Sequence, residues 1–402
     1  MFASSSTKIV FLIPEFARGG TQRQVYLLAR EFKQRHGSNV EVWALFSSGE
    51  YAKEFEAAGV PTKVLGFLRP QCPVRIVRTW YWARRLLQIA KQFRAAGVDV
   101  LLPFTSWPNV IAGLTYRLGG VRLCIWGERS SGVDRVRMER LALRQYRTFI
   151  ANSTAGVDFL SGEMGVSRSL ISYVPNAVEE PKAGNSIDWR NRLGLAPGQL
   201  LVLKVANIMR FRDHATLLHA WKHLQDAWQG EPKPVLALAG AFGDSFRDVQ
   251  RIWREGRLDS TVRFMGAVQD VGALIDASDL AVFTSRKEGM PNAILECMAG
   301  GKAVIATDLP GIRDALGPNA GDVLVPAGDP VQLARRLLDL LPDASRRTSL
   351  GDRNRKYALS EFTVARMANT YLDVMERQSQ SLRFAKHQKA AQTADEPRSH
   401  SA

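Results

Sequence analysis

The chain has 402 residues, of which 46% are hydrophobic and 23% are charged, and its formal net charge is +15. This composition is typical of a globular protein, and the length favours two domains over one. No apolar run reaches the roughly 18 residues that a membrane span requires, so the sequence predicts no transmembrane helix. The first residues lack a charged segment ahead of a long apolar stretch, and we therefore predict no signal peptide.

The sequence also predicts no metal site. The three cysteines, Cys72, Cys124 and Cys297, are far apart and odd in number, which favours a reducing cytoplasm and argues against a structural zinc. His219 and His223 are spaced i, i+4, a spacing that can hold a metal, but no third ligand accompanies them. We interpret them as ordinary helix histidines.

In the first half of the chain, strand-like and helix-like segments alternate. Residues 8–14 predict a buried parallel strand, and a helix follows from Gly19-Gly20 to about Arg35. Further strands are predicted at 40–46, 98–104, 123–127 and 148–151, with helical segments between them. This alternation predicts a doubly wound α/β domain.

The same pattern restarts at residue 200 and predicts a second domain. Its predicted strands are 200–205, 235–239, 262–265 and 280–283, and its predicted helices include 215–224, 247–255 and one after Pro330. The intervening segment is rich in Pro, Gly and Asn, as linkers are. We therefore divide the chain into an N-terminal domain (1–180), a linker (181–198), a C-terminal domain (199–360), a C-terminal helix (361–377) and a polar tail (378–402) predicted to be disordered.

Two glutamates flank the start of a predicted helix. The strand at 280–283 leads into a turn, and a helix opens at Pro291, where the missing proline N–H costs nothing. Glu288 lies just before that helix and Glu296 lies on it. Free backbone N–H groups at a helix N-terminus suit a phosphate. The arrangement is that of a nucleotide-sugar site, with one carboxylate toward a sugar and one toward a ribose diol; the alternative is a solvent-capped helix with ordinary surface acids.

At these residues the chain resembles a known family. Residues 285–305 resemble the E-x7-E signature of retaining glycosyltransferases of family 4, which have the two-domain GT-B fold. Other matching pieces occur in the family's order: 18–22, 151–153, 174–178, 205–214, 262–266 and 321–326. The resemblance runs from about residue 7 to about residue 375 and is more specific in the second half.

The resemblance implies a fold, a mechanism and roles for individual residues. The fold is α/β, with two Rossmann-like doubly wound domains facing across a cleft, the first for the acceptor and the second for the nucleotide sugar. The helix at 361–377 returns to the first domain. Glu288 is the implied catalytic residue, stabilising positive charge at the anomeric carbon, and Glu296 binds the ribose diol. The other implied donor-binding residues are Gly19, Gly20, Arg210, Arg212, Gly289, Met290, Pro291 and Asn292.

The implied reaction needs no cofactor and no metal, because no Asp-x-Asp motif occurs and protein cations stabilise the leaving diphosphate. It proceeds by front-face attack, with the leaving phosphate assisting removal of the acceptor proton.

The chain departs from the family pattern in two places. Asn207 and Arg212 stand where the family has Arg and Lys, so one charge near the diphosphate is lost. Residues 125–131 lack the histidine that many members place in the cleft, and they resemble an S-E-R-N variant of some bacterial members. Glu128 and Arg129 there are acceptor-side or diphosphate-side candidates, or a structural pair in a loop.

The positive charge is concentrated in one segment. Between Ala57 and Gly127 the only acidic residue is Asp99, against ten Lys or Arg. A predicted helix here places Ile76, Trp80, Ala83, Leu87 and Ala90 on one face, flanked by Trp82, Leu86, Ile89 and Phe93, with Arg78, Arg84, Arg85 and Lys91 opposite. Such a helix can lie at an anionic membrane surface, or its apolar arc can face the core of an α/β domain. A basic face that is merely solvated is a further alternative.

We therefore predict a retaining hexosyl- or N-acetylhexosaminyltransferase of bacterial-type surface polysaccharide or glycoconjugate biosynthesis. Its partners are a nucleotide-sugar donor, a glycan or polyprenyl-diphosphate-linked acceptor, and an anionic membrane surface at the cytoplasmic face. Two alternatives are an impaired sugar-nucleotide-binding paralogue and a basic nucleic-acid-binding protein. For the latter, basic residues interleaved with exposed aromatics occur only near residues 75–94, so we expect no nucleic acid.

Overall fold

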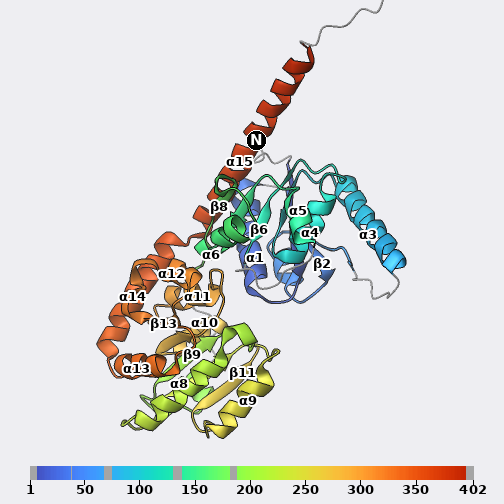
Figure 1. Cartoon of the computed structure of the whole chain (residues 1–402). Coiled ribbons are helices and arrows are strands. Elements are labelled where there is room, and N and C mark those ends of the chain that lie inside the picture. Colours follow the sequence, from blue (N-terminus) through green and yellow to red (C-terminus); the bar gives the residue numbers. More distant parts are fainter. Residues whose placement is uncertain (1–6, 38, 68–74, 130–137, 182–187, 395–402) are drawn as a thin grey trace, which may run out of the picture. The chain divides into compact units, whose positions relative to one another are not determined.

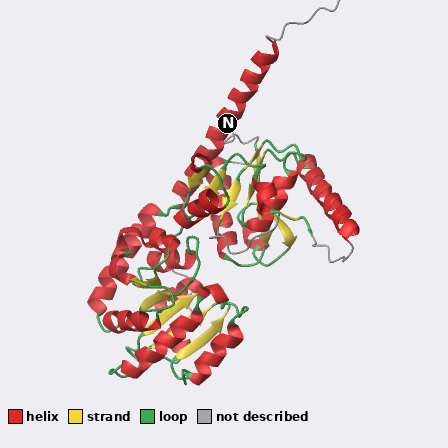
Figure 2. Ribbon diagram, viewed as in Figure 1, coloured by secondary structure: helices red, strands yellow, loops and turns green. Residues whose placement is uncertain are grey.

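The computed structural model describes residues 7–37, 39–67, 75–129, 138–181 and 188–394 (Figure 1). The chain forms two compact units. Unit 1 comprises residues 1–151, 157–174 and 364–402, and unit 2 comprises residues 152–156 and 175–363. In each unit, helices pack around parallel strands (Figure 2).

Unit 1 contains two parallel sheets, one with the strand order β3-β2-β1-β4-β5 and one with the order β6-β7-β8. Strand β1 is central and almost wholly buried, which explains its near-continuous run of apolar residues. The strands are β1 Lys8–Glu15, β2 Asn39–Ser47, β3 Thr62–Val64, β4 Val100–Pro103, β5 Leu123–Cys124, β6 Trp126–Glu128, β7 Phe149–Ala151 and β8 Ile171–Tyr173. The helices are α1 Gly20–His36, α2 Ala52–Ala57, α3 Arg75–Ala95, α4 Ser106–Thr115, α5 Glu139–Leu143 and α15 Val364–Ala394. The short helix α6 (Thr154–Asp158) lies where the two units divide.

Unit 2 is built on a single parallel sheet with the order β11-β10-β9-β12-β13-β14. The strand order reverses at β9, which pairs with both β10 and β12, and open α/β sheets bind ligands beside such a reversal. The strands are β9 Leu201–Val205, β10 Val235–Ala239, β11 Val262–Gly266, β12 Leu280–Phe283, β13 Val304–Thr307 and β14 Leu324–Val325. The helices are α7 Trp189–Arg192, α8 His214–Ala227, α9 Phe246–Glu255, α10 Val271–Ala277, α11 Asn292–Ala299, α12 Pro310–Leu316, α13 Pro330–Leu340 and α14 Ala344–Glu361.

The predicted fold class is confirmed, but two predicted segments differ. The linker at 181–198 is not a bare connection, because α7 lies within it and Trp189, only 6% exposed, packs into the core of unit 2. The tail at 378–402 is helical as far as Ala394, because α15 continues beyond the predicted end at 377. Low apolar content argued for disorder there, yet residues of good helix propensity such as Lys, Gln and Ala dominate 386–394.

Helix α3 buries one of the two apolar stripes that its sequence carries and exposes the other. Ile89 and Phe93 are buried, and Trp82 packs on Phe67 and Trp107 with ring centroids 5.1 and 5.9 Å apart. The flanking stripe at 82, 86, 89 and 93 is therefore the core face, while Trp80 and Leu87 are 61% and 52% exposed. Of the predicted face through Trp80, Leu87 and Ala90, only Ala90 is buried, so the core alternative holds for the flanking stripe and the exposed part of the arc is left for another surface. Ile76 and Arg78 lie outside the described side chains.

No helix in the described ranges combines the length and apolarity needed to cross a bilayer.

Candidate active site

The predicted donor residues of unit 2 meet at the carboxyl ends of β9 and β12, where the strand order reverses. The loop after β9 carries Arg210 and Arg212, and the loop after β12 carries Ser285 and Glu288. A backbone bond from the Arg286 N–H to the Phe211 carbonyl, 2.8 Å long, joins the two loops. Residues 75 positions apart in the sequence are thereby brought together.

Glu288 and Arg212 form the central ion pair of the site. The Arg212 guanidinium donates to Glu288 Oε1, and the Ser285 hydroxyl donates to the same oxygen over 2.8 Å. The Glu288 side chain is only 8% exposed, whereas that of Arg212 is 30% exposed. The pair is therefore largely desolvated on the carboxylate side and open on the guanidinium side, where an anion can approach.

Helix α11 begins at this site. Pro291 is its N-cap, and its side chain supplies no capping hydrogen bond. The helix begins at Asn292, one residue later than predicted. Asn176 fixes the entering loop, because its amide donates to the Met290 carbonyl at 2.9 Å and to Asn292 Oδ1 at 2.6 Å.

The loop between Glu288 and α11 is also held from the β13 side. The Thr307 hydroxyl bonds both the N–H and the carbonyl of Ser285, each over 3.1 Å. Gly311, near the start of α12, lies so close to the loop that a Cβ there would stand 1.7 Å from the Gly289 carbonyl oxygen. Only glycine allows this approach. The position of Glu288 is thus set by three neighbouring loops.

A buried lysine connects the loop after β9 to the loop after β12. Lys204 is 1% exposed, and its ammonium donates to the Arg212 carbonyl, the Thr284 carbonyl and the Thr284 hydroxyl at 2.8, 2.7 and 2.6 Å. Burial and the nearby Arg212 lower the pKa of Lys204 to about 7, partly offset by Glu288 and Asp213. The pKa of His214 is lowered to about 2, mainly by burial and then by the positive charges of Lys204 and Arg212. The imidazole is therefore neutral.

Sequence reasoning missed Lys204, Ser285, Thr307 and Asn176 as contributors to the site. Lys204 had a visible signal, because a lysine inside a buried parallel strand must have partners. The other three are ordinary polar residues whose roles depend on contacts between distant loops.

The remaining predicted donor residues of unit 2 lie nearby, with different surroundings. Asn207 accepts a bond from the Ala241 N–H at 3.0 Å, which ties the loop after β9 to the loop after β10. Arg210 is exposed, and its N–H donates to Asp244 Oδ1 at 2.8 Å. Glu296 is half-buried on α11, one helical turn after Asn292 and on the same face.

The predicted residues of unit 1 have structural surroundings of their own. Gly19 caps α1, and a Cβ there would meet only the flexible tip of Gln22, at 2.6 Å. Glu128 is buried and accepts from the Trp126 indole N–H at 3.2 Å. The Arg129 guanidinium donates to the Tyr371 hydroxyl at 2.5 Å and lies 4.7 Å from the Phe104 ring centroid. Arg129 therefore anchors α15 to unit 1, and the acceptor-side role of both residues stays a prediction.

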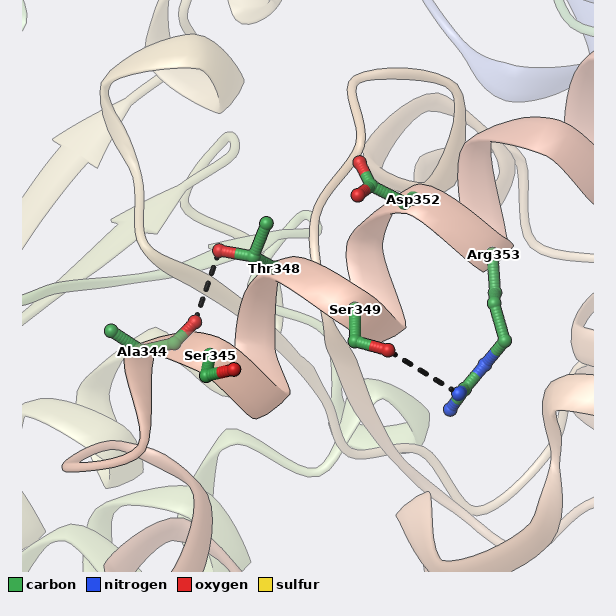
Figure 3. Close-up of a pocket in the computed structure, with 6 residues that line it drawn as sticks. All are labelled: Ala344, Ser345, Thr348, Ser349, Asp352 and Arg353. Carbon is green, nitrogen blue, oxygen red and sulfur yellow. Dashed lines mark hydrogen bonds between the residues drawn. The ribbon is translucent and has the colours of Figure 1, made fainter.

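A shallow depression elsewhere on unit 2 contains none of these residues. It is lined by residues of α14 alone, namely Ala344, Ser345, Thr348, Ser349, Asp352 and Arg353 (Figure 3). The side chains drawn there are bonded within the helix, from Thr348 to the Ala344 carbonyl and from Arg353 to Ser349. One exposed helix surface of this kind offers no convergent polar groups, so we place the site at Arg212 and Glu288.

Comparisons with known proteins identify the family of the chain. Residues 18–180 match the model of the family described as Glycosyltransferase Family 4, and residues 199–343 match the model described as Glycosyl transferases group 1. The chain is 25% identical over 360 residues to the 2-deoxystreptamine N-acetyl-D-glucosaminyltransferase of Streptomyces fradiae, covering 82% of this chain and 84% of that protein. It is 26% identical over 175 residues to the lipopolysaccharide core biosynthesis glycosyltransferase LpsE of Rhizobium meliloti, covering 44% of this chain and 49% of that protein.

A solved structure has the same fold. Anabaena HepE, in complex with UDP and glucose, superposes with a TM-score of 0.77 at 19% identity, over 92% of this chain and all of HepE. The two family models match the two α/β units in turn. The chain therefore belongs to the glycosyltransferases of family 4, which have the GT-B fold.

Proposed function

We propose that this enzyme is a retaining glycosyltransferase that moves a sugar from a nucleotide diphosphate to a glycan or lipid-linked acceptor of bacterial surface-glycan synthesis. The observation that carries the proposal is the Arg212–Glu288 pair beside the N-terminus of α11. A guanidinium suits a diphosphate because it donates two parallel hydrogen bonds. The N-terminus of α11, with the positive end of the helix dipole, adds a second anion-binding element at the same place.

The ion pair suggests how the donor enters. Without donor, Arg212 neutralises the largely buried Glu288. An arriving diphosphate brings more negative charge and takes over the guanidinium, which leaves Glu288 held by Ser285 and facing the sugar. As the bond from the anomeric carbon to the phosphate oxygen breaks, positive charge grows on the sugar and negative charge on the diphosphate. Glu288 stabilises the first, and Arg212 with the α11 N–H groups stabilises the second.

We propose a retaining course for the transfer. The acceptor hydroxyl attacks the anomeric carbon on the face that the diphosphate leaves, and its proton passes to the departing phosphate oxygen. With donor bound, Glu288 still accepts the hydrogen bond from Ser285, which holds the carboxylate in place as an electrostatic stabiliser. We assign the ribose diol to Glu296 and acceptor recognition to unit 1, with Glu128 and Arg129 as candidates.

The donor is proposed to be a UDP-hexose or a UDP-N-acetylhexosamine, since HepE is bound to UDP and glucose and the Streptomyces fradiae relative is named an N-acetylglucosaminyltransferase. Purified enzyme offered a panel of UDP-, GDP- and TDP-sugars should release UDP. Release should persist in EDTA, because Arg212 and α11 supply the positive charge. Loss of release in EDTA with recovery on added magnesium would contradict metal independence. Binding without release from any donor would favour the impaired paralogue.

We also propose that unit 1 places the enzyme on the cytoplasmic face of an anionic membrane. The exposed side of α3 presents Trp80 and Leu87 together with Arg84 and Lys91, and the Arg84 guanidinium lies 5.4 Å from the Trp80 ring centroid. We call these four residues the α3 strip. Apolar side chains interleaved with cations suit a lipid headgroup region, where each basic residue contributes about 1 kcal/mol.

Replacing Arg84 and Lys91 of the α3 strip by Gln should weaken binding to phosphatidylserine vesicles by roughly 30-fold, the equivalent of about 2 kcal/mol. Added salt should weaken wild-type binding, because the attraction is screened. The matched control removes two exposed charges of unit 2, Arg254→Gln and Lys356→Gln. An equal loss in the control, or tight DNA binding without vesicle binding, would contradict the proposal.

A further inference from the structure

We infer that Lys204 is a positioning residue for the proposed transfer, holding the Arg212 loop against the Glu288 loop so that both side chains face the donor. The effect on sugar transfer rests on the proposed function. The contact between the two loops rests on the hydrogen bonds of Lys204. Lys204 lies in β9, buried under the two loops. Its ammonium bonds to Arg212 and Thr284, and we assign it no contact with the nucleotide sugar.

The hydrogen bonds of Lys204 match an ammonium group in number. An ammonium has three N–H donors, and the structure supplies three acceptors: the Arg212 carbonyl, the Thr284 carbonyl and the Thr284 hydroxyl. The Thr284 hydroxyl in turn donates to the Asp213 carbonyl at 2.8 Å. A neutral amine has only two N–H donors and one lone pair. One of the three oxygens would then face the nitrogen lone pair and receive no hydrogen bond from Lys204. The geometry is therefore that of the charged form.

These bonds join the two loops that carry the ion pair. One acceptor belongs to Arg212 itself, and the other two belong to Thr284, which directly precedes Ser285. A second crosslink above them, between Arg286 and Asp213 with Nε and Oδ2 3.2 Å apart, spans the same two loops. Lys204 is the buried member of this arrangement, and its charge is attracted by Glu288 and Asp213 and repelled by Arg212.

The charge of Lys204 should respond to the donor. The pKa of Lys204 is about 7 in the empty site, mainly because of burial and then because of Arg212. A diphosphate bound to Arg212 counters that repulsion, so it favours the protonated amine and raises this pKa. At a pH where Lys204 is partly deprotonated in the empty enzyme, donor binding should therefore be accompanied by proton uptake. His214, the nearest imidazole, is neutral at such a pH because its pKa is about 2.

The unit contains a matched control. Lys302 is a half-buried lysine, and burial lowers its pKa as it does that of Lys204. Its ammonium donates to the carbonyls of Asp276 and Ser278 at 2.9 Å each. It precedes β13 and therefore lies at the amino edge of the sheet, opposite the donor residues. Lys204→Met removes an ammonium group at the carboxyl edge of the sheet, and Lys302→Met removes one at the amino edge.

The first measurement needs no donor. The Arg286 N–H to Phe211 carbonyl bond reports directly on the junction of the two loops. Hydrogen exchange of the Arg286 amide, followed by NMR, should be roughly tenfold or more faster in Lys204→Met than in the wild type, and unchanged in Lys302→Met. Unchanged exchange in Lys204→Met would overturn the inference, whatever the enzyme binds.

The second measurement is calorimetry of UDP-sugar binding at pH 7.5 in buffers of different ionisation enthalpy. A nucleotide sugar lacks the terminal phosphate that titrates near neutral pH. Wild type and Lys302→Met should take up protons on binding, and Lys204→Met should take up fewer. Equal uptake in all three proteins would overturn the inference. Failure of the wild type to bind any nucleotide sugar would instead count against the proposed function, while the exchange result would still decide the role of Lys204.

Discussion

Glu288→Gln is expected to lower turnover by about two or more orders of magnitude with little change in donor affinity. The carboxylate is 8% exposed and held by Arg212 and Ser285, so its charge acts with little screening by water. Glutamine keeps the size and most of the hydrogen bonds of the side chain but removes the negative charge that opposes the developing positive charge on the sugar. The measurement is kcat for nucleotide release, together with donor Kd from calorimetry.

The matched comparison is Glu296→Ala. Glu296 is expected to bind the ribose, which does not change charge during the reaction, so this variant should weaken donor binding and leave kcat closer to the wild type. Undiminished turnover in Glu288→Gln would refute the catalytic assignment. The same loss of affinity in both variants would show that Glu288 acts only in binding.

Arg212→Gln is expected to reduce kcat/KM by roughly 100- to 1,000-fold, the loss typical of removing one group that stabilises a developing anion. Two effects combine, because the diphosphate loses a cation and Glu288 is left buried without its ion-pair partner. Arg212→Lys should recover part of the activity, since the charge returns without the two-pronged geometry. Steady-state kinetics with the best donor of the panel measures both effects.

The control for Arg212 is Arg313→Gln. Arg313 also pairs with a carboxylate, Asp308, after β13 on the same edge of the sheet, but that pair is exposed. Its loss should leave kcat/KM within about twofold of the wild type, as expected for a surface ion pair. Equal losses in the two variants would mean that the ion pairs support the fold of this edge and not the donor.

The alternation of strands and helices, together with the family resemblance, predicted the fold, and the local pattern around Glu288 predicted the strand, turn and helix found there. A buried strand, a turn and a helix with glutamates before and within it are short-range features, and the structure has each of them. Lys204, Asn176 and Thr307 were missed because their functions depend on hydrogen bonds to loops 80, 114 and 22 residues away. No local pattern encodes such pairings.

The face of α3 illustrates a different limit. The sequence carries two adjacent apolar stripes, one through Trp80 and Leu87 and one through Trp82 and Phe93, and both have helical spacing. Periodicity cannot decide which of them meets the sheet. The packing of Trp82 edge-on to Phe67 and stacked on Trp107 decides it, and these contacts depend on the loop after β3 and on α4.

The most direct test of the central claim is a crystal structure of the Glu288→Gln variant with an intact nucleotide sugar. The diphosphate should contact the Arg212 guanidinium and the first N–H groups of α11, with the sugar beside position 288 and the ribose hydroxyls on Glu296. A nucleotide sugar bound in unit 2 without contact to Arg212 or α11, for example along α14, would contradict the account.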